Sequence, residues 1–347
     1  MKSNVNQTKN KYSLGEIITF LLLLFFIVTI AINPAKYSKA SYEGIIVWAK
    51  ILLPSLLPFF IITKLFASSG IIFDISNLFA PISKKLFKCS PITSYIFFMS
   101  IISGYPVGSK LVSDLYNEKL ISINDAQKSL SFCANCGPMF ILGSVGTGMI
   151  NNFKIGLIIY ISHIIGSIIN GIVYKNIGQN KNNLKAIQNK QQDIKQHISI
   201  CKENDFALTK KLIKKISFSD SVMQSVLSAL LIGGVVCFCF VLIEIITTNP
   251  VFVKFFNIFG DFSRIFTAFF SGILEITRGC FMITSCNLPL NIMTPLLTFI
   301  ISFGGISTML QSMAFTNKII STKRFCLFKF THAVFSSFIC FLLLFVF

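Results

Sequence analysis

The sequence predicts an all-α membrane protein that crosses the bilayer several times. Apolar residues make up 53% of the 347-residue chain, and charged residues only 13%. Two nearly uncharged stretches, 17–32 and 325–347, are about as long as the hydrocarbon core of a bilayer requires. Glycine-rich polar breaks interrupt the apolar sequence at matching places in its two halves, a pattern typical of transporters built from an inverted repeat.

Four breaks define this repeat. In the first half SGYPVGSK (103–110) is followed by SFCANCGPM (131–139), and in the second SGILEITRG (271–279) is followed by SFGGISTM (302–309). The second break begins 28 residues after the first in one half and 31 residues after it in the other. Unwound backbone is tolerated at membrane depth only where protein covers it or water reaches it. The paired breaks therefore predict a substrate site.

Seven membrane spans and two re-entrant hairpins follow from the order of the apolar segments. The apolar segment 91–102 is too short to cross the bilayer, and 111–120 is too polar to complete the crossing. We therefore expect 91–120 to fold back on itself, and 262–285 repeats its pattern. Two of the spans should break near their middle, at Gly137-Pro138 and Gly304-Gly305. The predicted spans are 17–32, 45–67, 129–150, 155–174, 219–247, 291–313 and 325–347, with a short outer loop between the first two.

The same pattern divides the chain into four units. An N-terminal tail with the first span (1–44) precedes a first inverted repeat (45–174), and a basic cytoplasmic linker (175–218) leads to a second inverted repeat (219–347). The end of the linker, 207–217, has a basic amphipathic pattern that suits the surface of an anionic leaflet, although a solvated basic loop has the same composition.

Positive charge sets the predicted orientation. With both hairpins re-entrant, 23 of the 31 Lys and Arg residues fall in inner segments and four in outer loops, as the positive-inside rule requires. This arrangement opens the first hairpin to the cytoplasm and the second to the outside, so the two halves are inverted. The inner count includes Lys329, which we assign to a basic loop before the last span. The rule also explains the net charge of +18 without a nucleic-acid partner.

The candidate substrate-binding residues share a position at the four breaks, where half-helices end and glycines allow close backbone approach. They are Ser103, Gly104, Tyr105, Ser109, Asn135, Gly137, Glu275, Thr277, Arg278, Gly304, Ser307 and Gln311. Helix N-termini favour anions, and helix carbonyl ends favour cations. The alternative is that the glycines only permit tight helix packing.

Charged and polar residues inside the apolar segments sharpen this interpretation. Glu275 and Arg278 lie three residues apart, so they can share a helical face and bind substrate or form an ion pair that locks the hairpin. His163 and His332 are each expected to be hydrogen-bonded core residues. Cys133-x-x-Cys136 has no second pair and no nearby His, so no metal and no cofactor is expected. No enzyme signature is present, and no enzymatic activity is expected.

Four sequence segments carry a resemblance to a known family. At SGYPVGSK, NCGPMFILGSVGTGM, GILEITRG and FGGISTMLQ the chain resembles the sporulation integral membrane proteins called YlbJ (stage V sporulation protein V), within the nucleoside-recognition or Gate-domain group. The group is similar in plan to concentrative nucleoside transporters, in which two re-entrant hairpins face two broken helices. Cys136 and Arg278 depart from the pattern expected of the family.

The resemblance implies a function. Members are implicated in moving dipicolinic acid across the outer forespore membrane during sporulation, which implies a multi-pass protein of that membrane and a small organic anion as substrate. A nucleoside or nucleobase carrier, and a non-transporting membrane scaffold needed for the spore cortex, remain as alternatives. The expected partners are the small-molecule substrate and the lipid bilayer, and homo-oligomer formation is left open.

Overall fold

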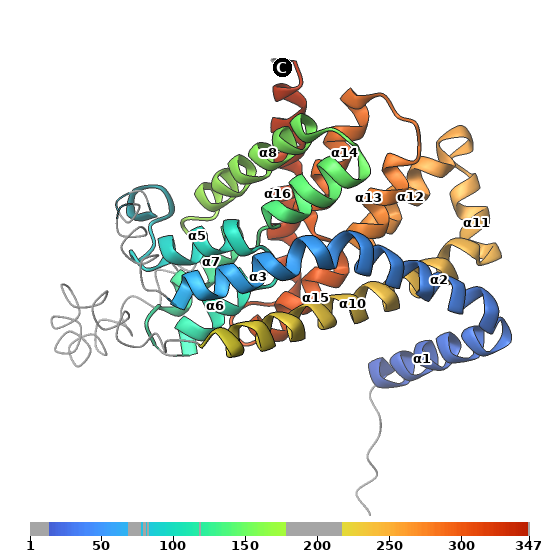
Figure 1. The fold of residues 1–347 in the computed structure, drawn as a ribbon, viewed down its shortest axis with the longest axis horizontal. Coiled ribbons are helices and arrows are strands. Elements are labelled where there is room, and N and C mark those ends of the chain that lie inside the picture. Colours follow the sequence, from blue (N-terminus) through green and yellow to red (C-terminus); the bar gives the residue numbers. More distant parts are fainter. Residues whose placement is uncertain are drawn as a thin grey trace, which may run out of the picture.

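The computed structural model describes residues 14–68, 83–117, 119–177 and 217–345, together with positions 78 and 81. These residues form helices joined by short turns, and none of them belongs to a strand (Figure 1). The predicted all-α class is confirmed. The N-terminal tail and most of the predicted linker, including the basic stretch 207–216, lie outside the described residues.

The same order of elements occurs in both halves of the chain. Each half has a long helix, a helical hairpin, an interrupted helix and a second long helix. In the first half these are α2 (Pro34–Val47), η1 (Trp48–Leu52) and α3 (Leu53–Ser68); α5 (Thr93–Ser103) and α6 (Val107–Asn117); α7 (Ile123–Phe132) and η3 (Met139–Met149); and α8 (Phe153–Val173). In the second half they are α10 (Phe218–Thr248); α12 (Ser263–Leu274) and α13 (Ile276–Thr284); α14 (Leu290–Phe303) and α15 (Gly305–Thr316); and α16 (Thr322–Leu343).

Three short elements lie outside this scheme. The π-helix η2 (Ser83–Phe87) precedes the first hairpin, while α11 (Pro250–Asn257) and the 3₁₀-helix η4 (Gly260–Phe262) precede the second. The helix α1 (Leu14–Ile32) packs on α2 at the edge of the molecule (Figure 1).

Corresponding helices of the two halves are neighbours. α10 runs along α2 and α3, and α8 packs against α16 (Figure 1). The backbones of this second pair nearly touch, because a Cβ added to Gly166 would lie 2.9 Å from the Cα of Ser336. Small residues at such crossings let helices associate in lipid, where no hydrophobic force drives them together. The twofold pattern of elements fits the predicted repeat, while the inverted orientation in the bilayer stays a prediction.

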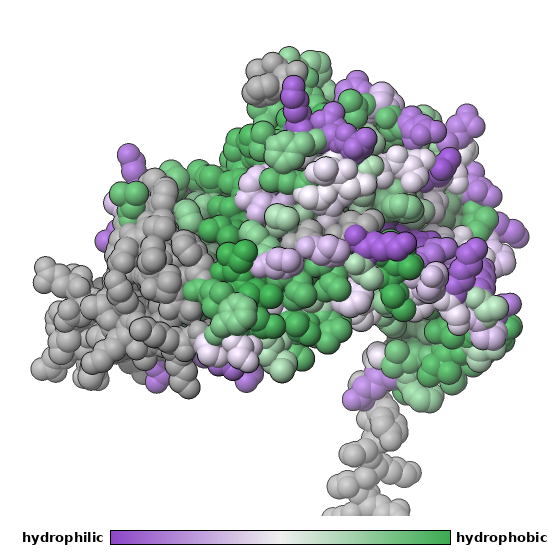
Figure 2. Space-filling view, in the orientation of Figure 1, coloured by the Kyte–Doolittle hydropathy of each residue, from purple (hydrophilic) through white to green (hydrophobic). Residues whose placement is uncertain are grey.

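Five described helices are long and apolar enough to cross a membrane. They are Gly15–Ile32, Phe153–Val173, Phe218–Thr248, Leu290–Thr316 and Thr322–Leu343, and they coincide with five of the seven predicted spans. The other two predicted spans, 45–67 and 129–150, are divided among shorter helices. In Figure 2 apolar residues cover much of the face over α3 and α10, whereas hydrophilic residues gather along α2 and the upper right edge. The chain is therefore a multi-pass integral membrane protein.

The predicted outer loop before the second span is helical. α2 begins at Pro34, where a proline at the first helical position loses no hydrogen bond, and the helix continues through η1 into α3. Lys36, Lys39 and Glu43 consequently lie on a helix. This matters for the site because Glu43 projects from a rigid element.

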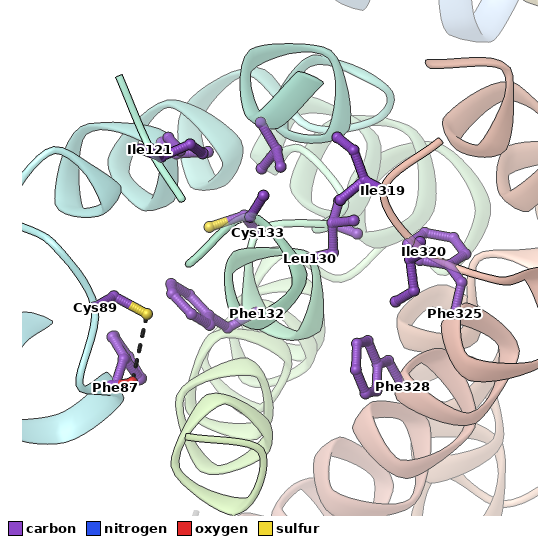
Figure 3. Close-up of a cluster of buried hydrophobic side chains, with 14 of the residues drawn as sticks. Phe87, Cys89, Ile121, Leu130, Phe132, Cys133, Ile319, Ile320, Phe325 and Phe328 are labelled. Atoms are coloured by element: carbon purple, nitrogen blue, oxygen red, sulfur yellow. Dashed lines mark hydrogen bonds between the residues drawn. The ribbon is translucent and has the colours of Figure 1, made fainter. Parts of the chain in front are cut away.

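A buried aromatic and aliphatic core holds the first interrupted helix in place. Phe132, at the end of α7, stacks on Phe87 with ring centroids 4.1 Å apart. Figure 3 shows Leu130 and Phe132 of α7 between the Phe87 side of the core and a second group formed by Ile319, Ile320, Phe325 and Phe328. This core joins the first hairpin region to the start of α16, so both halves of the chain position the break that follows α7.

Candidate functional site

The four predicted breaks come together in space. The chain leaves helical structure at 104–106 between α5 and α6, at 133–137 between α7 and η3, at Glu275 between α12 and α13, and at Gly304 between α14 and α15. A Cβ added to Gly104 would overlap the amide of Gly137, so the first hairpin tip lies directly on the first interrupted helix.

The second half repeats this contact. A Cβ added to Gly305 would lie 3.2 Å from the carbonyl oxygen of Gly272 in the second hairpin. Gly304 has φ +85°, in the left-handed region that glycine adopts without strain, and this allows α14 to end and α15 to begin within one residue. The two halves meet at Tyr105, because a Cβ on Gly304 would lie 2.9 Å from the Tyr105 hydroxyl oxygen.

Two adjoining cavities lie at this meeting point. The smaller, of about 80 Å³, is surrounded by both hairpin tips, both interrupted helices and the side chains of α3 and α10. The larger, of about 380 Å³, lies between the first hairpin, α3 and α10, and it also includes Lys110 and Asp114. Ser103 and Tyr105 line both. Ligand pockets typically measure about 300–1,000 Å³, so the larger cavity has the size of a small-molecule site and the smaller one is too small to hold such a ligand alone.

Eight of the twelve candidate residues line the smaller cavity. They are Ser103, Gly104, Tyr105, Gly137, Glu275, Thr277, Ser307 and Gln311. Gly304 lies beside Tyr105, as described above. Ser109 and Asn135 are buried behind the first hairpin tip, where the Asn135 amide nitrogen donates to Ser100 Oγ at 3.0 Å and to the Phe132 carbonyl at 2.8 Å.

Glu275 caps the helix that follows it. Its Oε2 accepts a hydrogen bond of 2.7 Å from the backbone amide of Arg278, and Glu275 is the N-cap residue of α13. A carboxylate at this position satisfies an otherwise unpaired amide and complements the helix dipole. The N-terminus of α13 is therefore already occupied by a negative charge from its own chain.

Arg278 is the candidate that points away from both cavities. Its guanidinium pairs with Glu244 of α10 at 3.1 Å and with Glu43 of α2 at 3.3 Å, and it lies over the Phe240 ring at 4.8 Å. Its side chain does not pair with that of Glu275, contrary to one of the two interpretations that the three-residue spacing suggested. In this arrangement Arg278 ties the second hairpin to the two long helices α2 and α10.

Lys329 is a buried basic residue next to the cavities, although the sequence analysis placed it in a loop. We assigned it to an interfacial loop, but it lies on α16 and is only 2% exposed. Its ammonium nitrogen contacts the Tyr105 hydroxyl and the Ala134 carbonyl, the latter at 2.7 Å. It also lies 4.8 Å from the centroid of the Tyr105 ring. The available signal was its position inside the predicted span 325–347, where a charged residue is costly unless it has a partner.

The two histidines face each other behind this lysine. Their ring centroids are 4.7 Å apart. His163 Nε2 accepts from the Cys136 amide at 3.0 Å, so its proton lies on Nδ1, which is 2.8 Å from Ser302 Oγ. His332 Nε2 donates to the His163 carbonyl at 3.0 Å. The expectation of hydrogen-bonded core histidines is confirmed, and the contacts join the first interrupted helix to α8, α14 and α16.

Several polar groups near the first hairpin tip have no hydrogen-bond partner among the described residues. They include Ser103 Oγ, Ser109 Oγ and Asn135 Oδ1. Buried polar atoms are nearly always satisfied, so such a group points to a missing partner. In addition, α15 begins without a side-chain cap, and its first turn contributes Ser307 and Thr308 to the smaller cavity. Unpaired amides at a helix N-terminus favour an anion.

The fold and the cavities define a multi-pass integral membrane protein with a polar interior at the meeting point of interrupted helices. One curated relative narrows this class: the sporulation integral membrane protein YlbJ of Bacillus subtilis (strain 168) is 26% identical over 322 residues, covering 86% of this chain and 76% of the relative. The chain is similar to this relative over most of its length. No family model and no solved structure matches it.

Proposed function

We propose that this protein is a membrane transporter of a small organic anion. The observation that carries the proposal is the meeting of four helix interruptions around a cavity beside the buried Lys329. A non-transporting scaffold has no need for unwound, glycine-lined backbone in its interior, whereas transporters build their substrate sites from such breaks. The two hairpins line the smaller cavity from different halves of the chain.

The charges favour an anion. All ion pairs among the described residues involve Arg278, so Lys329 has no carboxylate partner there. A buried cation without a counter-charge is costly, and a substrate carboxylate supplies the missing charge. The uncapped first turn of α15 and the unpartnered Ser103 hydroxyl add further groups that suit a carboxylate oxygen.

Within this class we propose dipicolinic acid, carried across the outer forespore membrane during sporulation. The relative's description as a sporulation integral membrane protein supports the biological setting. Dipicolinate is a planar dianion, so one carboxylate can meet Lys329 while the ring lies along Tyr105. The alternative is a nucleoside, for which the neutral groups of Ser307 and Gln311 in the same cavity are suitable partners.

Purified protein in liposomes tests the proposal directly. We expect saturable uptake of labelled dipicolinate that excess uridine does not inhibit. Lys329→Met should lower dipicolinate affinity about ten- to a hundredfold, since a charge-assisted contact contributes roughly 1.5–3 kcal/mol. The matched control is Lys128→Met, which removes a second buried lysine whose ammonium donates to the Lys88 carbonyl, away from the cavities. Uridine uptake without dipicolinate uptake would overturn the choice of substrate.

The scaffold alternative requires a cellular experiment. Deleting 180–200 leaves every described helix intact. Dipicolinate accumulation in spores should persist in this variant if the protein is a transporter. Loss of accumulation at an unchanged membrane level of the protein would favour a scaffold that recruits partners through the linker.

A further inference from the structure

The hydrogen bonds of Lys329 depend on its protonation. An ammonium has three donors and no acceptor, whereas a neutral amine has two donors and one lone pair. The nitrogen has two neighbours, the Ala134 carbonyl and the Tyr105 hydroxyl. A carbonyl can only accept, but a hydroxyl can donate or accept. A neutral amine fits both neighbours, because it donates to Ala134 and accepts the Tyr105 proton.

The charged form leaves one donor without a partner in this pocket. An ammonium can donate to the Ala134 carbonyl and to the Tyr105 oxygen, and its third N–H then requires another acceptor. Lys329 itself lines neither cavity, but its partner Tyr105 lines both, so the lysine adjoins the proposed substrate site through this side chain. A substrate carboxylate there supplies both the third acceptor and the counter-charge.

No described carboxylate forms an ion pair with Lys329: Glu275, which lines the smaller cavity, accepts from the Arg278 amide, and Asp114 lines the larger cavity beside Lys110. The ionisable groups that face it are Tyr105 from the first hairpin, Cys136 from the first break, His163 from α8 and His332 from its own helix. α14 and α15, which also pack on α16, carry no ionisable side chain.

The fourth neighbour of α16, the helix α7, keeps its charges elsewhere. Lys128 donates to the Lys88 carbonyl, and Asp125 accepts from the Ser90 amide at 3.4 Å. Since no described carboxylate pairs with Lys329, a substrate carboxylate is the counter-charge that we assign to it.

We propose that Lys329 takes up one proton when the substrate carboxylate binds and releases it when the substrate leaves, so that the protein moves its anion together with a proton. The proton comes from water on the side of entry, binds the amine lone pair, and returns to water on the side of release. This coupling rests on the proposed function, since it requires an anionic substrate. By linkage, the anion and the proton strengthen each other's binding by the same factor.

The protonation of Lys329 can be measured without any substrate. In protein labelled with ¹⁵N-lysine and reconstituted in bilayers, the Nζ signal that disappears in Lys329→Arg belongs to this residue. Near neutral pH we expect the chemical shift of a neutral amine in the empty protein and that of an ammonium after dipicolinate is added. Lys128 provides an internal reference, since its signal should not respond to dipicolinate.

Calorimetric titration of dipicolinate in buffers of different ionisation enthalpy counts the protons taken up. We expect one proton per dipicolinate for wild type and for Lys128→Arg, and none for Lys329→Arg, which keeps its charge and should bind dipicolinate with an affinity that no longer varies with pH. An ammonium signal in the empty protein, or dipicolinate binding without proton uptake, overturns this inference and leaves the proposed function standing. Absence of dipicolinate binding in wild type overturns the proposed function and this inference with it.

Discussion

Replacing Gly108 with Ala should separate the first hairpin from the first interrupted helix. A Cβ at this position would overlap the carbonyl oxygen of Cys133 and lie 2.8 Å from Ser100 Cβ. The carbonyl cannot move easily, because the Cys133 amide is bonded to Ser129 O at 2.7 Å and the preceding Phe132 is fixed in the core. Overpacking of this kind costs about 1–3 kcal/mol, or more where backbone must shift.

The expected net loss follows from two opposing effects. Alanine is about 1 kcal/mol better than glycine inside a helix, so part of the clash is offset. We expect Gly108→Ala to lower the free energy of unfolding by about 1–2 kcal/mol and to weaken dipicolinate binding, because the displaced hairpin carries Ser103 and Tyr105. Equilibrium unfolding in mixed micelles measures the first effect and calorimetric titration the second.

Gly234 provides the matched control. It lies inside α10 with no atom within 4 Å of an added Cβ, so Gly234→Ala should stabilise the protein by up to about 1 kcal/mol. The two variants should therefore differ by roughly 2–3 kcal/mol. If Gly108→Ala stabilises the protein as much as Gly234→Ala does, the first hairpin does not pack against the first interrupted helix as described, and the reasoning is refuted.

Three further predictions address the second hairpin, the cavity and the topology. Combining Arg278→Gln with Glu244→Gln in a double-mutant cycle should reveal a coupling of about 1–2 kcal/mol in the free energy of unfolding. Dipicolinate affinity should change little, because this partly buried pair lies outside the cavities. A large loss of affinity would show that Arg278 contacts the substrate. Ser103→Ala should lower dipicolinate affinity about two- to tenfold without loss of stability, since an unpaired buried hydroxyl disappears. Unchanged affinity would remove Ser103 from the site. Single cysteines at positions 84 and 254, replacing Lys84 and Lys254 in a cysteine-free background, should react from opposite faces of the membrane, and reaction from one face would refute the inverted repeat.

The four breaks were predictable because their causes are local. Glycine and polar residues inside an apolar segment mark places where helical backbone is unfavourable, and Gly104 and Gly304 both adopt positive φ. Helix ends at Ser103, Phe132 and Phe303 follow from this local signal. The grouping of eight of the twelve candidate residues around the smaller cavity followed as well, since unwound backbone at membrane depth needs a protected interior.

The partners of the charged residues were not predictable, because they depend on contacts far apart in the chain. Arg278 meets Glu43, which lies 235 residues away. Lys329 meets Tyr105, which lies 224 residues away. The positive-inside rule assigns lysines near the end of a span to the loops, and its use here placed Lys329 in a loop before the last span. Only the packing of α16 against the first half of the chain shows that its lysine is buried.

The position of α16 has a consequence for how the protein is made. Of the described helices this one is synthesised last, yet it completes hydrogen bonds of residues synthesised much earlier. Asn170 donates to the Phe328 carbonyl at 3.0 Å and accepts from Thr331 at 2.7 Å, and the His163 carbonyl accepts from His332. Until α16 inserts, these groups face lipid or a partly assembled bundle. Chains that stop before residue 322 should therefore be retained by membrane quality control, because the first half of the chain lacks these partners until α16 inserts.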